Sequence, residues 1–128
     1  GEVMDPRIRA RIENGASFAA ADYAAVLQRR EQLRVSVCER LGDVDAAICP
    51  TMLTPAPRIV DVDVAPVRLT TRLVNFLGLC AVSLPCGRAK GHLPIGLQII
   101  GKPFGEARIL QLGYAYEQAI HSGRPPGF

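Results

Sequence analysis

Residues able to carry out covalent chemistry are few in this 128-residue sequence. Its serines, lysines and histidines are spread along the chain: Ser17, Ser36, Ser83, Ser122, Lys90, Lys102, His92 and His121. A serine nucleophile needs a base beside it, and neither lysine lies near paired serines. Ser83 stands in Ala-Val-Ser-Leu-Pro, which lacks the glycines of a nucleophile elbow. We therefore expect Ser83 to be a strand residue bonded to backbone, and we assign no catalytic residue.

The four cysteines also lack the pattern of a functional site. Cys38, Cys49, Cys80 and Cys86 show no C-x-x-C spacing of the kind found in zinc and redox sites. Cys86 and His92 offer either a thiolate–imidazole pair or two metal ligands. Nothing completes a triad or a ligand set around them, which favours a buried thiol and a turn histidine. No phosphate-binding glycine motif occurs either, so we predict no metal and no cofactor.

Helices are expected to dominate the first third of the chain. Residues 5–15 predict a short helix. Apolar residues at three-to-four-residue spacing over residues 23–41 predict a longer one whose apolar stripe is buried. Ser17 or Asp22 is expected to cap the start of this helix, and Gly42 is expected to end it.

A strand, a loop and a short helix are expected next. Val44–Cys49 is a short apolar run, typical of a buried strand, and Pro50 ends it. Met52–Pro66 holds three prolines and little periodicity, which indicates a long loop. Thr70–Leu77 predicts two turns of helix with a threonine cap.

The last third predicts two strands and a helix. Ala81–Leu84 and Pro94–Ile100 are the expected strands, joined by a glycine-bounded turn over Pro85–His92. Gly96 within a strand indicates a bulge or a close backbone approach. A final helix is expected from Glu106, whose charge suits a helix N-terminus.

This order of elements indicates an α/β fold with about three strands flanked by helices. Three short strands are few for an independent sheet. They are also more apolar than edge strands normally are. We therefore interpret residues 1–128 as a single domain or as part of one, a slice of a larger sheet.

Composition excludes several classes of protein. Apolar residues make up 48% and charged residues 21%, which argues against disordered, collagen-like and coiled-coil chains. The net charge is only +3 and aromatic residues are 5%, so we expect no nucleic-acid binding. The longest uncharged stretch, Leu73–Gly87, is too short and too interrupted to span a membrane. With no apolar targeting segment, a cytoplasmic protein is expected.

Five sequence stretches in a fixed order resemble the C-terminal part of the amidase signature family. They are Asp45–Thr51, Asn75–Leu79, Ser83–Gly87, Leu93–Phe104 and Ala115–Ala119. The family includes allophanate hydrolases and the A subunit of tRNA-dependent amidotransferase. The resemblance spans essentially the whole chain but only the last quarter to third of a typical family member.

The resemblance implies a segment without the catalytic centre. Family members hydrolyse amides with a Ser–cis-Ser–Lys triad, which lies upstream of the region seen here. The segment is then expected to complete the sheet and a pocket wall, to be inactive alone, and to meet an amide substrate only in the complete enzyme. In relatives that bind a carboxylate-bearing substrate, an arginine in the matching Arg-x-x-x-Gly turn holds that group. Arg11 occupies this position, and a surface arginine is the alternative.

The sequence also departs from the family pattern. Arg68 stands where glutamine-binding relatives carry an acidic residue, and Leu73 and Cys80 each replace a usual proline. Three hypotheses remain. The chain is the C-terminal segment of an amidase, partnered by an N-terminal catalytic part. It is instead a non-catalytic stand-alone interaction module that associates with itself or another protein. The third hypothesis, a small enzyme using Cys86, lacks any visible group that would activate the thiol.

Overall fold

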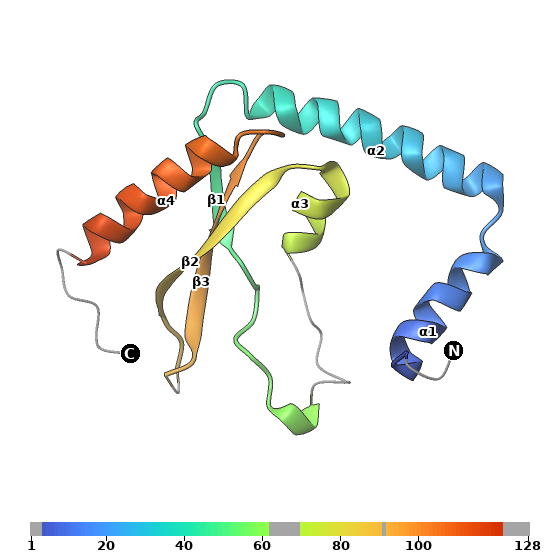
Figure 1. Ribbon diagram of the computed structural model, residues 1–128, viewed down its shortest axis with the longest axis horizontal. Helices are drawn as coiled ribbons and strands as arrows, with labels where there is room; N and C mark the ends of the chain where they lie inside the picture. Colours follow the sequence, from blue (N-terminus) through green and yellow to red (C-terminus); the bar gives the residue numbers. More distant parts are fainter. Residues whose placement is uncertain (1–3, 62–69, 91, 122–128) are drawn as a thin grey trace.

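The computed structural model describes residues 4–61, 70–90 and 92–121 (Figure 1). It has four α-helices, three strands and two 3-10 turns in this described part: α1 Pro6–Glu13, η1 Asn14–Ser17, α2 Ala20–Arg40, β1 Ala47–Pro50, η2 Ile59–Asp61, α3 Thr71–Leu77, β2 Cys80–Arg88, β3 Pro94–Gly101 and α4 Glu106–His121. The predicted mixed α/β class with about three flanked strands is confirmed. Part of the predicted loop, residues 62–66, and Arg68 lie outside the described residues.

The three strands form one antiparallel sheet in the order β1-β3-β2. β2 is longer than predicted, because the Pro85–Gly87 turn signals are absorbed by a register shift between these two residues. Gly87 has φ +144°, which a glycine adopts without strain. The connection to β3 is correspondingly tighter, and the amide of Ala89 donates to the carbonyl of Leu93 at 2.8 Å.

β1 begins three residues later than predicted. Its register pairs Ala47 with Ile100 and Pro50 with Leu97. Val44 instead belongs to the turn that follows α2, where its amide donates to the Leu41 carbonyl at 3.4 Å. Proline closes the strand because β1 lies at the edge of the described sheet, where a missing donor is tolerated.

The core lies between α4 and one face of the sheet. Cys80, Ile99 and Ile109 are buried together there, and the partly buried Val82 and Leu112 pack against them. α4 lies on one side of the sheet and α3 on the other, with α2 running alongside α3 (Figure 1). Alternate side chains of β3 therefore face α4 on one side of the sheet and the α3 side on the other.

α2 confirms the predicted helix but not its predicted packing. Tyr23 and Val26 are 63% and 52% exposed, and within the expected stripe over residues 23–41 only Leu41 is buried. Along most of its length, the apolar stripe therefore has no packing partner among the residues that the structure describes. The capping prediction was also wrong: Ala19 is the N-cap residue, and the hydroxyl of Ser17 donates to the Asn14 carbonyl.

The described part of the chain leaves many large apolar side chains exposed. Ile59, Phe104 and Phe18 are 91%, 96% and 69% exposed. In the described part of the chain, no helix combines the length and apolarity that crossing a bilayer requires.

Candidate functional site

The sheet face opposite α4 carries a row of polar side chains. Cys49, Gln98 and Ser83 are adjacent across β1, β3 and β2. Gln98 is only 3% exposed, and its Oε1 lies 3.5 Å from the Cys49 thiol, which donates to it. The only sequence signal for this row was Gln98, a polar residue within the otherwise apolar strand β3.

Two hydroxyl groups meet above a glycine at the end of this row. Thr51 Oγ1 and Ser83 Oγ lie 2.5 Å apart, and either group is able to donate. A Cβ atom on Gly96 would lie 2.7 Å from the first oxygen and 2.9 Å from the second. The predicted close approach at Gly96 is therefore confirmed. The predicted bond from Ser83 to backbone was wrong, because its partner is the side chain of Thr51.

Thr70 connects the start of α3 to the end of β1. It holds the N-cap position, but its side chain makes no cap hydrogen bond. Its hydroxyl instead donates to the carbonyl of Pro50 at 2.9 Å and also contacts the carbonyl of Thr51. The sequence predicted a threonine cap for this helix, but the hydroxyl of Thr70 instead binds the loop that follows β1.

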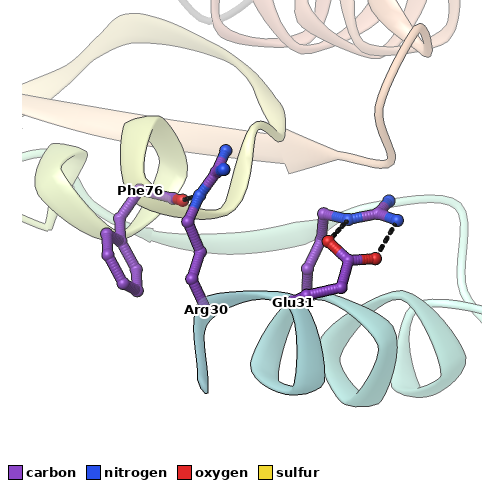
Figure 2. A network of polar contacts seen from close by, with 4 residues as sticks. Arg30, Glu31 and Phe76 are labelled. Carbon is purple, nitrogen blue, oxygen red and sulfur yellow. Dashed lines mark hydrogen bonds and ion pairs between the residues drawn. The ribbon is translucent and has the colours of Figure 1, made fainter. Parts of the chain in front are cut away.

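The other end of α3 is fixed by α2. Figure 2 shows the guanidinium of Arg30 directed at the carbonyl of Phe76, to which its Nε donates. The next residues form a Schellman motif: the Leu79 amide donates to the Val74 carbonyl at 3.0 Å, and Gly78 has φ +64°. Arg30 satisfies a carbonyl of the last turn and places a cation at the negative end of the helix.

An open groove of about 630 Å³ lies beside the hydroxyl pair. Its wall is formed mainly by apolar and proline residues of the loop after β1 and the start of β3: Pro50, Met52, Leu53, Thr54, Pro55, Ala56, Pro57, Pro94, Ile95 and Gly96. None of the described residues that line it is titratable. The groove is suited to hold an apolar group, and no described lining residue is a base that could activate a hydroxyl there.

Arg11 lies on α1, away from this groove. Its side chain is exposed, and α1 stands beyond α3 from the sheet, contacting η1 (Figure 1). The structure therefore does not bring Arg11 together with the polar row. No group of three or more candidate metal ligands occurs among the described residues.

Cys86 and His92 are not a catalytic pair in this structure. Cys86 is exposed at the β2 bulge, contrary to the expectation of a buried thiol. His92 is exposed in the hairpin turn with φ +64°, and its amide donates to the Ala89 carbonyl at 3.1 Å. In the described part of the chain no hydrogen bond links the two side chains, so nothing supports a cysteine enzyme.

Comparison with known proteins identifies the fold. Residues 1–110 match the family described as Amidase. This chain belongs to the amidase family. The resemblance carried by the sequence motifs is thereby confirmed.

The amidase-family relatives are much longer than this chain. The glutamyl-tRNA(Gln) amidotransferase A subunit from Thermodesulfovibrio yellowstonii is 40% identical over 92% of this chain and 27% of its own length. Its counterpart from Geobacter metallireducens is 47% identical, with 92% of this chain and 26% of that protein covered. The chain thus spans about a quarter of the relatives it matches.

A solved structure agrees with this family assignment. A crystal structure of an amidase superposes with a TM-score of 0.78 at 25% identity, covering 92% of this chain and 29% of that one. The antiparallel sheet and its helices therefore correspond to part of a larger amidase chain.

Proposed function

We propose that this chain is the C-terminal segment of an amidase-family hydrolase of carbon–nitrogen bonds. It would complete the sheet and form one wall of the acyl pocket, and it would be inactive alone. The observation that carries the proposal is the apolar surface that the described residues leave exposed. Tyr23 and Val26 on α2 are 63% and 52% exposed, and Ile48 on β1 is 69% exposed. Exposed apolar surface spread over several elements is typical of a segment that packs against a larger partner.

The distribution of these apolar side chains also argues against the stand-alone interaction module. They lie on α2, on β1 and in the turn before α4. One self-association interface of standard size, about 800 Å² on each partner, would cover only some of them. The remainder of an amidase chain, about three times the length of this segment in the relatives, is a partner of sufficient size.

The polar row and the groove support a role in binding rather than in chemistry. Among the described residues, the Thr51–Ser83 pair and the groove beside it have no general base. The nucleophile and its base would come from the upstream part, and this segment would shape the site for a small amide. The apolar groove wall suits an apolar acyl group.

We also propose Arg11 as a carboxylate-binding residue of the complete enzyme. The support is its exposed guanidinium at the end of α1 and the match of its turn to the family pattern. Such a group binds a carboxylate through two parallel hydrogen bonds. Substrates that bear a carboxylate would reach it only when the upstream part is present.

A chimera tests the proposed function. The matching quarter of the Geobacter metallireducens relative is replaced by this chain, and hydrolysis of a panel of small amides is followed by product release. We expect the chimera to fold and to hydrolyse at least one amide, and the 128-residue chain alone to hydrolyse none. Activity of the isolated chain, or a chimera that neither folds nor reacts, would refute the proposal. A stable, cooperatively folding dimer of the isolated chain would favour the interaction module.

A further inference from the structure

A phenylalanine occupies a position in the turn between β3 and α4 where glycine is normally preferred. Phe104 has φ +60° and is 96% exposed. It is the third residue of a turn closed by the Gly105 amide, which donates to the Lys102 carbonyl at 3.0 Å. Pro103 at the second position and a positive φ at the third are the features of a type II turn. A bulky side chain at that third position is conformationally strained.

The turn is held firmly against the core. The buried Cys80 thiol donates to the Lys102 carbonyl at 3.0 Å. The carbonyl of Gly105 accepts from the amides of Arg108 and Ile109, at 3.0 and 3.1 Å, in the first turn of α4. Because both sides of the turn are fixed, the chain holds Phe104 outward in a defined backbone conformation.

The surface next to this turn is open and partly apolar. Lys102 of the same turn lines a groove of about 820 Å³, together with Val44, Ile48 and Leu97 and with Asp43 and Asp45. Val44 and Ile48 are 50% and 69% exposed. The groove therefore runs along β1 and the α2–β1 connection and reaches the turn that carries Phe104 through Lys102.

We propose that Phe104 is an anchor residue by which this segment docks into an apolar pocket of the upstream part of the amidase chain. The inference rests on the proposed function. A fully exposed aromatic side chain on a rigid support is typical of residues that dominate interfaces. Glycine would satisfy the turn without strain, so the phenylalanine is best explained by a contact outside this segment. A second copy of the chain is the weaker occupant, because one interface between copies would leave apolar side chains on other elements exposed.

Three variants of Phe104, made both in the isolated chain and in the chimera, test the anchor. Phe104→Gly and Phe104→Asn remove the ring but suit a positive φ. Phe104→Leu keeps an apolar side chain at the same φ and is the matched control. In the chimera, we expect the glycine and asparagine variants to lower the unfolding midpoint by about 2 °C or more, and the leucine variant to lower it less. In the isolated chain, the glycine and asparagine variants should unfold at or above the parent midpoint.

The outcomes separate this inference from the proposed function. If the parent chimera folds and hydrolyses amides but all three variants have the same unfolding midpoint as the parent, Phe104 is not an anchor. If the variants instead abolish self-association of the isolated chain and leave the chimera unchanged, the occupant is a second copy and the inference is wrong. If the parent chimera does not fold, the proposed function fails and the anchor fails with it.

Discussion

Thr51 Oγ1 and Ser83 Oγ lie 2.5 Å apart directly above the backbone of Gly96, and so join both outer strands across the central one. The contact closes the side of the sheet next to the apolar groove. It requires that the residue between the two hydroxyls has no side chain. The arrangement makes Gly96 a structural requirement of the groove wall rather than a flexible point in a strand.

Replacing Gly96 by alanine should destabilise the chain by about 1–3 kcal/mol, because the added methyl would overlap both hydroxyl groups. Thermal and urea unfolding of the purified chain measure the change. Gly15→Ala is the matched control, since a Cβ there has no neighbour within 4 Å. Equal effects of the two substitutions would show that Gly96 is not a site of close approach.

The hydroxyl pair itself should contribute a measurable coupling energy. In a double-mutant cycle of Thr51→Ala and Ser83→Ala, we expect a coupling of about 0.5–1.5 kcal/mol, the usual range for one hydrogen bond. Urea unfolding of the parent, the two single variants and the double variant gives this value. A coupling of zero would mean that the two hydroxyls bond to water rather than to each other in solution.

Sequence patterns predicted which segments form helices and strands, because periodicity and turn residues are local properties. They did not predict where the side chains go. The stripe that begins at Tyr23 was expected to be buried, yet that side chain is 63% exposed. The hydroxyl of Thr70 bonds to the end of β1 instead of its own helix. Both errors concern contacts between distant segments, which local pattern does not encode.

Only part of the candidate site carries a local sequence signal. Gly96 does, because a glycine within a strand is unusual. The sequence did not predict the Thr51–Ser83 pair, because 32 residues separate the two and only the sheet register brings them together. Phe104 ends one of the stretches that resemble the family, but the sequence did not predict its positive φ, because that conformation depends on the packing of the turn on Cys80.

An ion pair on α2 should be visible in a pH titration. Arg34 donates to Glu31 at 2.9 and 2.5 Å, and this hydrogen bonding lowers the pKa of Glu31 below its ordinary 4.5, with smaller help from the positive charges of Arg34 and Arg30. Because the pKa of Glu31 is lower in the folded state than in the unfolded state, its pair with Arg34 stabilises the fold at pH values above the ordinary pKa. That contribution is lost as the pH falls through the lowered value. NMR titration of the Glu31 carboxyl should show the shift.

Removing the partner should reverse this shift. Arg34→Gln is expected to return the pKa of Glu31 toward 4.5. Arg29→Gln is the control, because Arg29 donates to Gln32 instead. A carboxyl that titrates identically in the parent and in Arg34→Gln would contradict the pairing. Because both side chains are exposed, we expect little change in overall stability.

The end of α3 gives a prediction about backbone conformation. Gly78 closes the Schellman motif with φ +64°, so Gly78→Ala should cost about 1 kcal/mol through the left-handed conformation alone. Urea unfolding measures the loss, and Gly15→Ala again serves as the control. If Gly78→Ala is neutral, the helix does not end in a left-handed residue in solution.

Arg11 can be tested only in the complete enzyme, so the chimera is again the right protein. Arg11→Ala should raise KM for amides that carry a carboxylate by about tenfold or more, which corresponds to the loss of a charge-assisted hydrogen bond. It should leave KM for uncharged amides within about twofold, because they offer the guanidinium no anionic partner. Arg9→Ala is the matched control, an exposed arginine on the same helix. A general loss of activity on both substrate classes would point to damage of α1. No change on either class would make Arg11 an ordinary surface residue.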